Sequence, residues 1–197
     1  MRKFILAVII LFFIPAGIIY AQNQPLPTKK KNTRFQSYNA IGLLTGEQTV
    51  SWSIQTVNGV QWKTFFVGAG LGFDFYRIGT TPVFLDLRKT FGQGRNKVFA
   101  YGDIGYQIPW PGNRADYFGV YTGDELTGGL YSDIGIGYLF EFGKKSALVL
   151  SAGYSYKALS EDVVAIPICL PGVPCEPQTG KYEYKFNRLS FKIGWRF

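Results

Sequence analysis

Residues 189–197 read LSFKIGWRF, and this stretch decides the fold class. Apolar side chains alternate in it with small or charged ones at every step. The apolar series is Leu189, Phe191, Ile193, Trp195 and Phe197. A period of two is the spacing of side chains on one face of a β-strand. The pattern therefore predicts a strand with one apolar, aromatic face.

The same period recurs along most of the chain, and we predict eight strands from it. The expected ranges are Tyr38–Glu47, Thr49–Asn58, Thr64–Tyr76, Pro82–Phe91, Lys97–Gln107, Leu130–Phe142, Ala147–Lys157 and Lys185–Phe197. Most are long enough for a tilted strand to cross a bilayer, which takes roughly 9–11 residues. The links after the second, fourth and sixth strands are short, whereas the loops 108–129 and 158–184 are long. This asymmetry is typical of outer-membrane barrels with both termini in the periplasm.

The two faces of each strand predict which side meets lipid. In the third expected strand, an apolar series from Phe65 to Phe75 alternates with Gly68, Gly70 and Gly72. A soluble barrel would place the apolar face inside and carry many hydrophilic side chains outside. A membrane barrel inverts this arrangement, and glycine suits the narrow interior of eight strands. We therefore expect the apolar faces to point outward.

Eight charged residues fall on the faces predicted to point inward. They are Asp74, Asp86, Arg88, Asp103, Asp133, Glu141, Lys192 and Arg196. Because buried carboxylates are costly without partners, we expect these groups to pair with one another and with interior water in one network. The alternative is a carboxylate active site or a proton path, in which two acids supply general acid and base chemistry.

The first 37 residues predict export. Arg2 and Lys3 precede an apolar run over 4–14, and Ile19-Tyr20-Ala21 offers a small-residue cleavage site, so 1–21 is expected to be a signal peptide. An uncleaved anchor is the alternative, although the run is shorter than the roughly 20 residues of a spanning helix. Residues 22–37 are expected to be a periplasmic linker whose lysines are solvated or contact an anionic surface, and 38–197 the barrel. Export makes nucleic acid an implausible partner despite the net charge of +8.

Cys169 and Cys175 enclose five residues, including a Pro-Gly turn, in the longest loop. Export favours oxidation, and the turn can bring the two Cα atoms within bonding range. We predict a disulfide that staples the loop; a redox pair or an intermolecular link is the alternative. The loop also carries an apolar stretch over 163–168, which either forms a recognition surface with loop 108–129 or packs with it over the barrel mouth.

The composition argues against catalysis. The chain of 197 residues contains no His, which removes the commonest general base, the base of a serine triad and a usual zinc ligand. The glycines at 68, 70 and 72 are spaced by two, so they fit a strand face and do not match a phosphate-binding turn. We predict a protein that is not an enzyme and has no metal or cofactor.

The end of the chain resembles the C-terminal signal by which the barrel-assembly machinery recognises outer-membrane proteins. The residues that carry it are Phe191, Ile193, Trp195 and Phe197. The chain as a whole resembles small barrels of the OmpA/OmpX architecture. It is more closely similar to the porin-like outer-membrane β-barrel domain family abundant in Bacteroidetes, through short segments at 56–59, 67–74, 82–88, 101–106 and 128–131. The resemblance covers about residues 38–197 and implies a fold but no catalytic residues.

The sequence thus predicts an all-β protein, an eight-stranded antiparallel up-and-down transmembrane β-barrel of the outer membrane. We expect a monomer with a structural or surface-interaction role, exerted through loops 108–129 and 158–184. Its expected partners are outer-membrane lipid and lipopolysaccharide, the barrel-assembly machinery and an extracellular ligand at the loops. Transport of small solutes or lipid, or an accessory part in secretion, is the alternative; an enzyme that modifies envelope lipid or glycan is the least favoured.

Overall fold

A computed structural model describes residues 33–47, 49–110, 121–123, 126–142, 146–165 and 178–197. These residues contain nine strands and no helix that is long and apolar enough to cross a membrane. The strands are β1 (Thr33–Thr45), β2 (Val50–Trp62), β3 (Phe65–Asp74), β4 (Thr80–Phe91), β5 (Asn96–Pro109), β6 (Tyr121–Gly123), β7 (Thr127–Phe142), β8 (Ser146–Ala165) and β9 (Gln178–Arg196).

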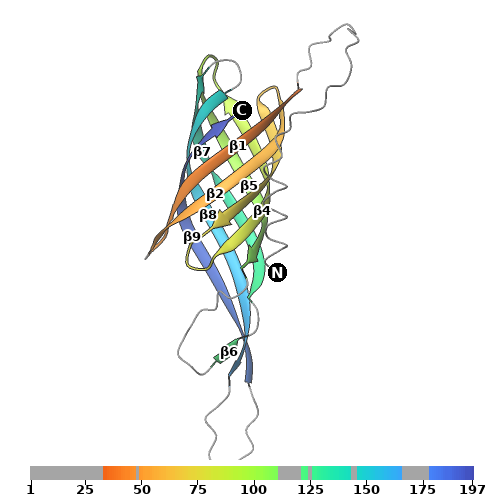
Figure 1. Ribbon diagram of the computed structural model, residues 1–197, viewed down its shortest axis with the longest axis vertical. Helices are drawn as coiled ribbons and strands as arrows, with labels where there is room; N and C mark the ends of the chain where they lie inside the picture. The colour runs from red at the N-terminus through yellow and green to blue at the C-terminus, as the bar shows by residue number, and fades with distance from the viewer. Residues whose placement is uncertain (1–32, 48, 111–120, 124–125, 143–145, 166–177) are drawn as a thin grey trace, which may run out of the picture. The chain divides into compact units, whose positions relative to one another are not determined.

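Eight of the strands close into an antiparallel barrel, which confirms the predicted fold class (Figure 1). Neighbours in sequence pair with one another, except that the short β6 lies in a loop and pairs only with β8. The barrel closes where β1 pairs with β9. At the end of this seam, Ser37 and Phe197 exchange two backbone hydrogen bonds of 2.9 and 3.0 Å. We call the end of the barrel where β1 begins and β9 ends the terminal rim, and the opposite end the loop rim.

Short connections lie at the terminal rim. Only Lys63 and Thr64 separate β2 from β3, and Lys63 has a positive φ of 54°. Between β4 and β5, Gly92 and Gly94 both have a φ of 91°, a conformation that side chains with a Cβ rarely adopt. These residues favour tight turns at this rim. The turns agree with the short links predicted after the second and fourth strands.

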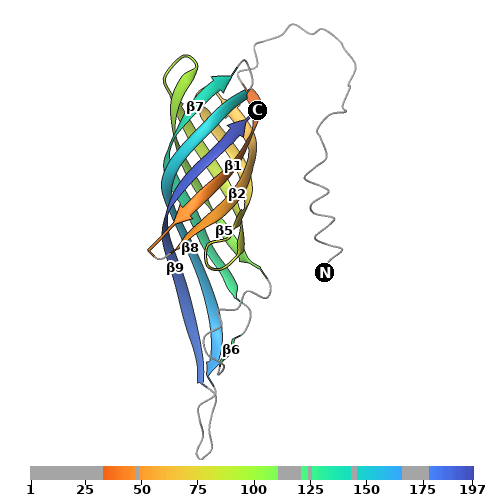
Figure 2. The same ribbon diagram turned by 60° about the vertical axis from the view of Figure 1, so that its left-hand side comes forward.

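The strands β8 and β9 are longer than predicted. They remain paired from Ala147 with Arg196 to Ala165 with Gln178, and together they extend beyond the rest of the barrel (Figures 1 and 2). The predicted ends at 157 and 185 were wrong because charged residues such as Glu161 and Glu183 resemble a loop. In the ribbon, Glu183 is exposed, while Glu161 is buried and accepts a hydrogen bond of 2.9 Å from the Tyr184 hydroxyl. Similarly, β1 begins at Thr33, inside the range expected for the linker.

Apolar side chains cover the outer face of the barrel. On β9 the outward residues from Leu189 to Phe197 are each at least half exposed, while Ser190 and Lys192 between them are buried. On β7, Ile134 and Ile136 are 66% and 64% exposed, and Asp133 is buried. The predicted orientation of the two faces is therefore correct.

The interior holds more aromatic residues than the sequence predicted. We expected mainly glycine and charge, whereas Tyr38, Phe66, Phe84, Phe99 and Tyr101 belong to a buried cluster. The inward glycines make room for these rings. A Cβ on Gly70 would lie 2.4 Å from the ring of Phe84, and one on Gly137 would lie 2.2 Å from that of Phe99. Ring and glycine on neighbouring strands thus form complementary pairs.

Candidate functional site: the charged interior

The interior charges form four groups of ion pairs along the barrel. Each group lies where inward residues of several strands meet. The alternation of side chains explains the placement, because every inward residue of a strand is flanked by inward residues in the same register on both neighbours. The groups follow one another from the loop rim to the terminal rim.

Nearest the loop rim, Asp74 of β3 pairs with two buried cations. Arg188 of β9 donates to one carboxylate oxygen of Asp74, and the Lys157 ammonium of β8 lies 3.5 Å from the same oxygen. Lys157 also donates to the backbone carbonyl oxygens of Tyr76 and Ile78, at 3.0 and 2.8 Å. The side chains of Arg188 and Lys157 are 0% exposed. One carboxylate thus pairs with two cations whose side chains are fully buried.

The second group contains a row of aspartates on adjacent strands. Asp86 of β4 stands opposite Asp103 of β5, and Asp103 stands opposite Asp133 of β7. The Lys192 ammonium lies 2.8 Å from Asp133 and 3.8 Å from Asp103. Asp133 also accepts hydrogen bonds from the hydroxyls of Tyr101, at 3.0 Å, and Ser190, at 3.1 Å. Lys192 therefore bridges two of the three carboxylates.

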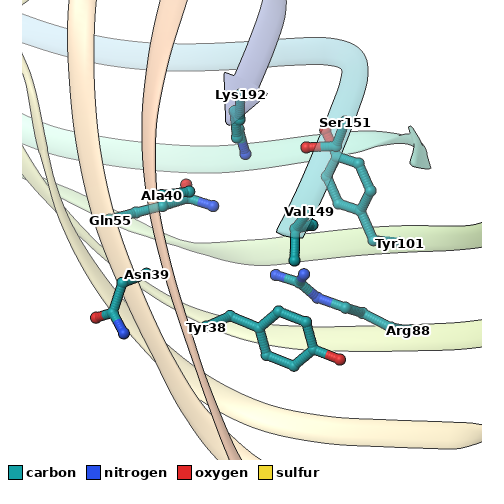
Figure 3. Close-up of a pocket in the computed structure, with 9 residues that line it drawn as sticks. All are labelled: Tyr38, Asn39, Ala40, Gln55, Arg88, Tyr101, Val149, Ser151 and Lys192. Carbon is teal, nitrogen blue, oxygen red and sulfur yellow. The ribbon is translucent and has the colours of Figure 1, made fainter. Parts of the chain in front are cut away.

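The third group is the pair of Asp86 and Arg88, enclosed by aromatic rings. The guanidinium donates through two nitrogens to the Asp86 carboxylate, at 2.6 and 2.9 Å. Its carbon lies 4.1 Å from the ring centroid of Tyr38 and 5.5 Å from that of Phe99. Figure 3 shows Arg88 and Tyr38 side by side, with Lys192 pointing toward the same space from β9. Paired charge and cation–π contact together stabilise Arg88 inside the barrel.

The last group lies near the terminal rim and is partly solvated. Glu141 of β7 accepts hydrogen bonds from Lys97, at 3.1 Å, and from Arg196, at 2.8 Å. The Glu141 side chain is 21% exposed, so water screens this group more than the other three.

All eight inward charges predicted from the sequence belong to these groups. Direct ion pairs join the described charges into four groups, and the single network through interior water that we expected stays a prediction. Three bases were missed: Lys97, Lys157 and Arg188. Lys157 and Arg188 lie near the ends of the predicted strands, where the period of two is hard to distinguish from a loop. Continuing the alternation from Ser190 to Arg188 would have found the second of them.

Little free space remains between the groups. Two cavities of about 10 Å³ lie in the interior, one beside Arg88 and Lys192 and one beside Asp74 and Arg188. Each has room for about one water molecule. Within the part of the chain that the structure describes, no three His, Cys, Asp or Glu side chains are arranged to hold a metal ion. The interior is thus a packed core of paired charges and rings.

The other predicted sites are placed only in part. Phe191, Ile193, Trp195 and Phe197 point outward beside the β1–β9 seam, where all four are at least half exposed. Cys169 and Cys175 lie outside the described residues, and the disulfide stays a prediction. Most of loop 108–129 and the apolar stretch 163–168 also lie outside them, apart from the backbone of β6 paired with Val163 to Ala165.

No family model and no curated protein sequence matches the chain. Among solved structures, it is similar to the N-terminal β-barrel domain of Pseudomonas aeruginosa OprF, with a TM-score of 0.53 and 11% identity over 84% of this chain and 98% of that one. Neisserial surface protein A matches with a TM-score of 0.48 and 10% identity, over 84% and 96% of the two chains. The outer membrane protein AlkL matches at 0.47 and 12%, over 90% and 95%. At this identity the likeness to the OprF domain shows the fold alone.

Proposed function

We propose that the protein is an integral outer-membrane β-barrel without enzymatic activity, whose role is structural or depends on surface contacts made by loops 108–129 and 158–184. The observation that carries this proposal is the combination of an apolar outer face with an interior filled by paired charges and aromatic rings. Such a molecule contacts lipid on its outside, and its described side chains fill the inside.

The height of the apolar surface supports membrane insertion. On β2, Trp52 and Trp62 are both more than half exposed and lie near the two ends of the apolar face. They are ten residue steps apart, which corresponds to roughly 33 Å along the strand. At a tilt of about 40°, this gives a band close to the 25 Å of outer-membrane barrels. Aromatic residues at both edges match the girdles that such barrels place at the two interfaces.

The packed interior argues against a diffusion pore. Eight strands leave an interior that side chains can fill, and two interior cavities of this barrel hold about one water molecule each. Arg88 and Lys192 project into the centre, where their pairing opposes any rearrangement that would open a path. The same packing argues against the acid and base chemistry considered for the inward carboxylates, because a substrate has no access to them.

Surface contacts are the remaining role, and the β8–β9 hairpin is the element best placed for them. It extends beyond the rest of the barrel (Figure 2), and its exposed residues include Lys181, Glu183 and Lys185. Lys185 lies 3.0 Å from Glu183 there, and its hydrogen bond lowers the pKa of that carboxyl. Lipopolysaccharide or an extracellular ligand would meet this hairpin first. The outward residues at the β1–β9 seam would serve recognition by the barrel-assembly machinery, and the short segments quoted above support membership of the Bacteroidetes barrel family.

Electrical recording on planar bilayers tests the proposal. Purified protein, refolded in detergent and added to the bilayer, is expected to give no reproducible large conductance, because the interior has no continuous path for ions. An open porin inserted under the same conditions is the positive control. Discrete, reproducible openings of porin size would contradict the proposal and favour the transport alternative.

A further inference from the structure

The lipid-facing side of β2 carries polar side chains in its middle. The outward residues of this strand are Val50, Trp52, Ile54, Thr56, Asn58, Val60 and Trp62. Thr56 and Asn58 interrupt a series that is otherwise apolar. Asn39 of β1 stands opposite Thr56 in the register, and its side chain points away from the interior cavity that Arg88 lines (Figure 3). We call Asn39, Thr56 and Asn58 the midline patch.

Thr56 and Asn58 lie deep in the apolar band, whereas Asn39 stands opposite Trp195 of β9. Thr56 comes four residues after Trp52, and Asn58 comes four residues before Trp62, so both lie well away from the aromatic residues at the two edges. On other strands, most outward residues midway along the band are apolar, as with Leu85, Ile104 and Ile136, although Ser132 of β7 is polar. The patch differs from the rest of this level in that it brings three polar side chains together.

The polar groups of the patch are not satisfied by their own barrel. Within the described residues, no hydrogen bond joins the side chain of Thr56 or Asn58 to another group. Asn39 reaches only the Ser37 hydroxyl, at a long 3.5 Å. An amide in hydrocarbon without a partner is unfavourable, because lipid tails cannot replace the hydrogen bonds that water would make. A partner inside the membrane would remove this penalty.

The surface around the patch allows close approach. Asn58 stands opposite Ala69 of β3, a small outward residue, while larger exposed side chains such as Val60, Val67 and Ile54 surround it. Small and polar residues together are typical of packed surfaces between transmembrane helices, and we extend the same reasoning to this barrel wall. A protein surface can therefore approach the patch closely.

We propose that the midline patch is the contact between two copies of this protein in the membrane. Its groups are uncharged, and each Asn amide and the Thr hydroxyl both donate and accept hydrogen bonds, so the patch is complementary to itself. A two-fold axis along the membrane normal keeps both copies in the same orientation and brings Asn58 against its equivalent. The proposal rests on the membrane insertion proposed above, and it replaces the monomer expected from the sequence.

Cross-linking in membranes tests the contact. In a Cys169→Ser/Cys175→Ser background, Asn58→Cys is expected to form a disulfide-linked dimer on mild oxidation in outer-membrane vesicles. The matched control is Leu87→Cys, which points outward on β4 four residues before Phe91, as Asn58 does before Trp62. It is expected to stay monomeric. Equal cross-linking of the two variants, or cross-linking of Asn58→Cys only to other proteins, would overturn the proposal.

A second variant separates a failed contact from a failed fold. Asn58→Leu replaces a polar group by an apolar one on the lipid face, so its folding is expected to be retained, as judged by the different gel migration of unboiled and boiled samples. The fraction of dimer in vesicles, measured by energy transfer between labelled copies at rising dilution, is expected to show roughly threefold to twentyfold weaker association. Unchanged association of this folded variant would contradict the proposal. Loss of membrane insertion by the unaltered protein would instead contradict the proposed function.

Discussion

Asp74→Asn is expected to lower the free energy of unfolding by about 3–5 kcal/mol. The substitution keeps the shape of the side chain but removes the one carboxylate within 4 Å of two buried cations, Arg188 and Lys157. Both cations are fully buried, and their mutual repulsion is then uncompensated. The measurement is urea-induced unfolding in lipid vesicles, followed by tryptophan fluorescence and extrapolated linearly to zero urea.

Glu183→Gln is the matched control for this prediction. It also removes one carboxylate from a pair with lysine, but both side chains are about 60% exposed on the β8–β9 hairpin. Exposed pairs contribute little, so the unfolding midpoint of this variant is expected to stay unchanged. Equal midpoints for Asp74→Asn and Glu183→Gln would show that the interior pair does not stabilise the barrel as we describe.

Arg88→Met is expected to destabilise the barrel by about the same 3–5 kcal/mol, because it leaves the Asp86 carboxylate buried and unpaired. Methionine fills much of the space between the rings of Tyr38 and Phe99, so the loss of charge pairing is the main effect. Arg88→Ala adds a cavity to this loss and is expected to be more destabilising still. The same urea titration gives the free energy of unfolding of the unaltered protein, Arg88→Met and Arg88→Ala.

A second substitution distinguishes pairing from packing at this position. Adding Asp86→Asn to Arg88→Met removes both charges, and replacing a whole buried pair is often nearly neutral. The double variant is therefore expected to recover most of the stability that Arg88→Met loses. A double variant as unstable as the single one would assign the stabilisation by Arg88 to its ring contacts alone. Lys89→Ala, which changes the neighbouring exposed cation, is the control.

The alternation of side chains predicted the barrel and its orientation because it is a local property. Stretches such as Leu189 to Phe197 show both faces of a strand within nine residues. The number of strands follows from counting such stretches, and the short turns follow from glycines such as Gly92 and Gly94. All of these features can be predicted from the order of the strands in the chain, without knowing the register in which the strands pair.

The grouping of the interior charges depends on register, which the sequence does not contain. The row of Asp86, Asp103 and Asp133 arises because three strands align at one level. The pairing of Asp74 with Arg188 joins β3 to β9 across the interior. The sequence did not predict the aromatic cluster for a related reason. Phe66 and Phe99 are flanked by apolar residues that point outward, so only their place in the alternation along the strand shows that they point inward. These rings then fit beside inward glycines on neighbouring strands, as Phe99 does beside Gly137.

The central claim is that this barrel resides in the outer membrane with its apolar face in lipid. Fractionated cells provide the most direct test, by gel migration of unboiled and boiled samples of the outer-membrane fraction. We expect the protein in that fraction, and we expect it to migrate at different positions before and after boiling, since the folded barrel resists detergent until heated. Recovery in the soluble periplasmic fraction, or a single position under both conditions, would contradict it.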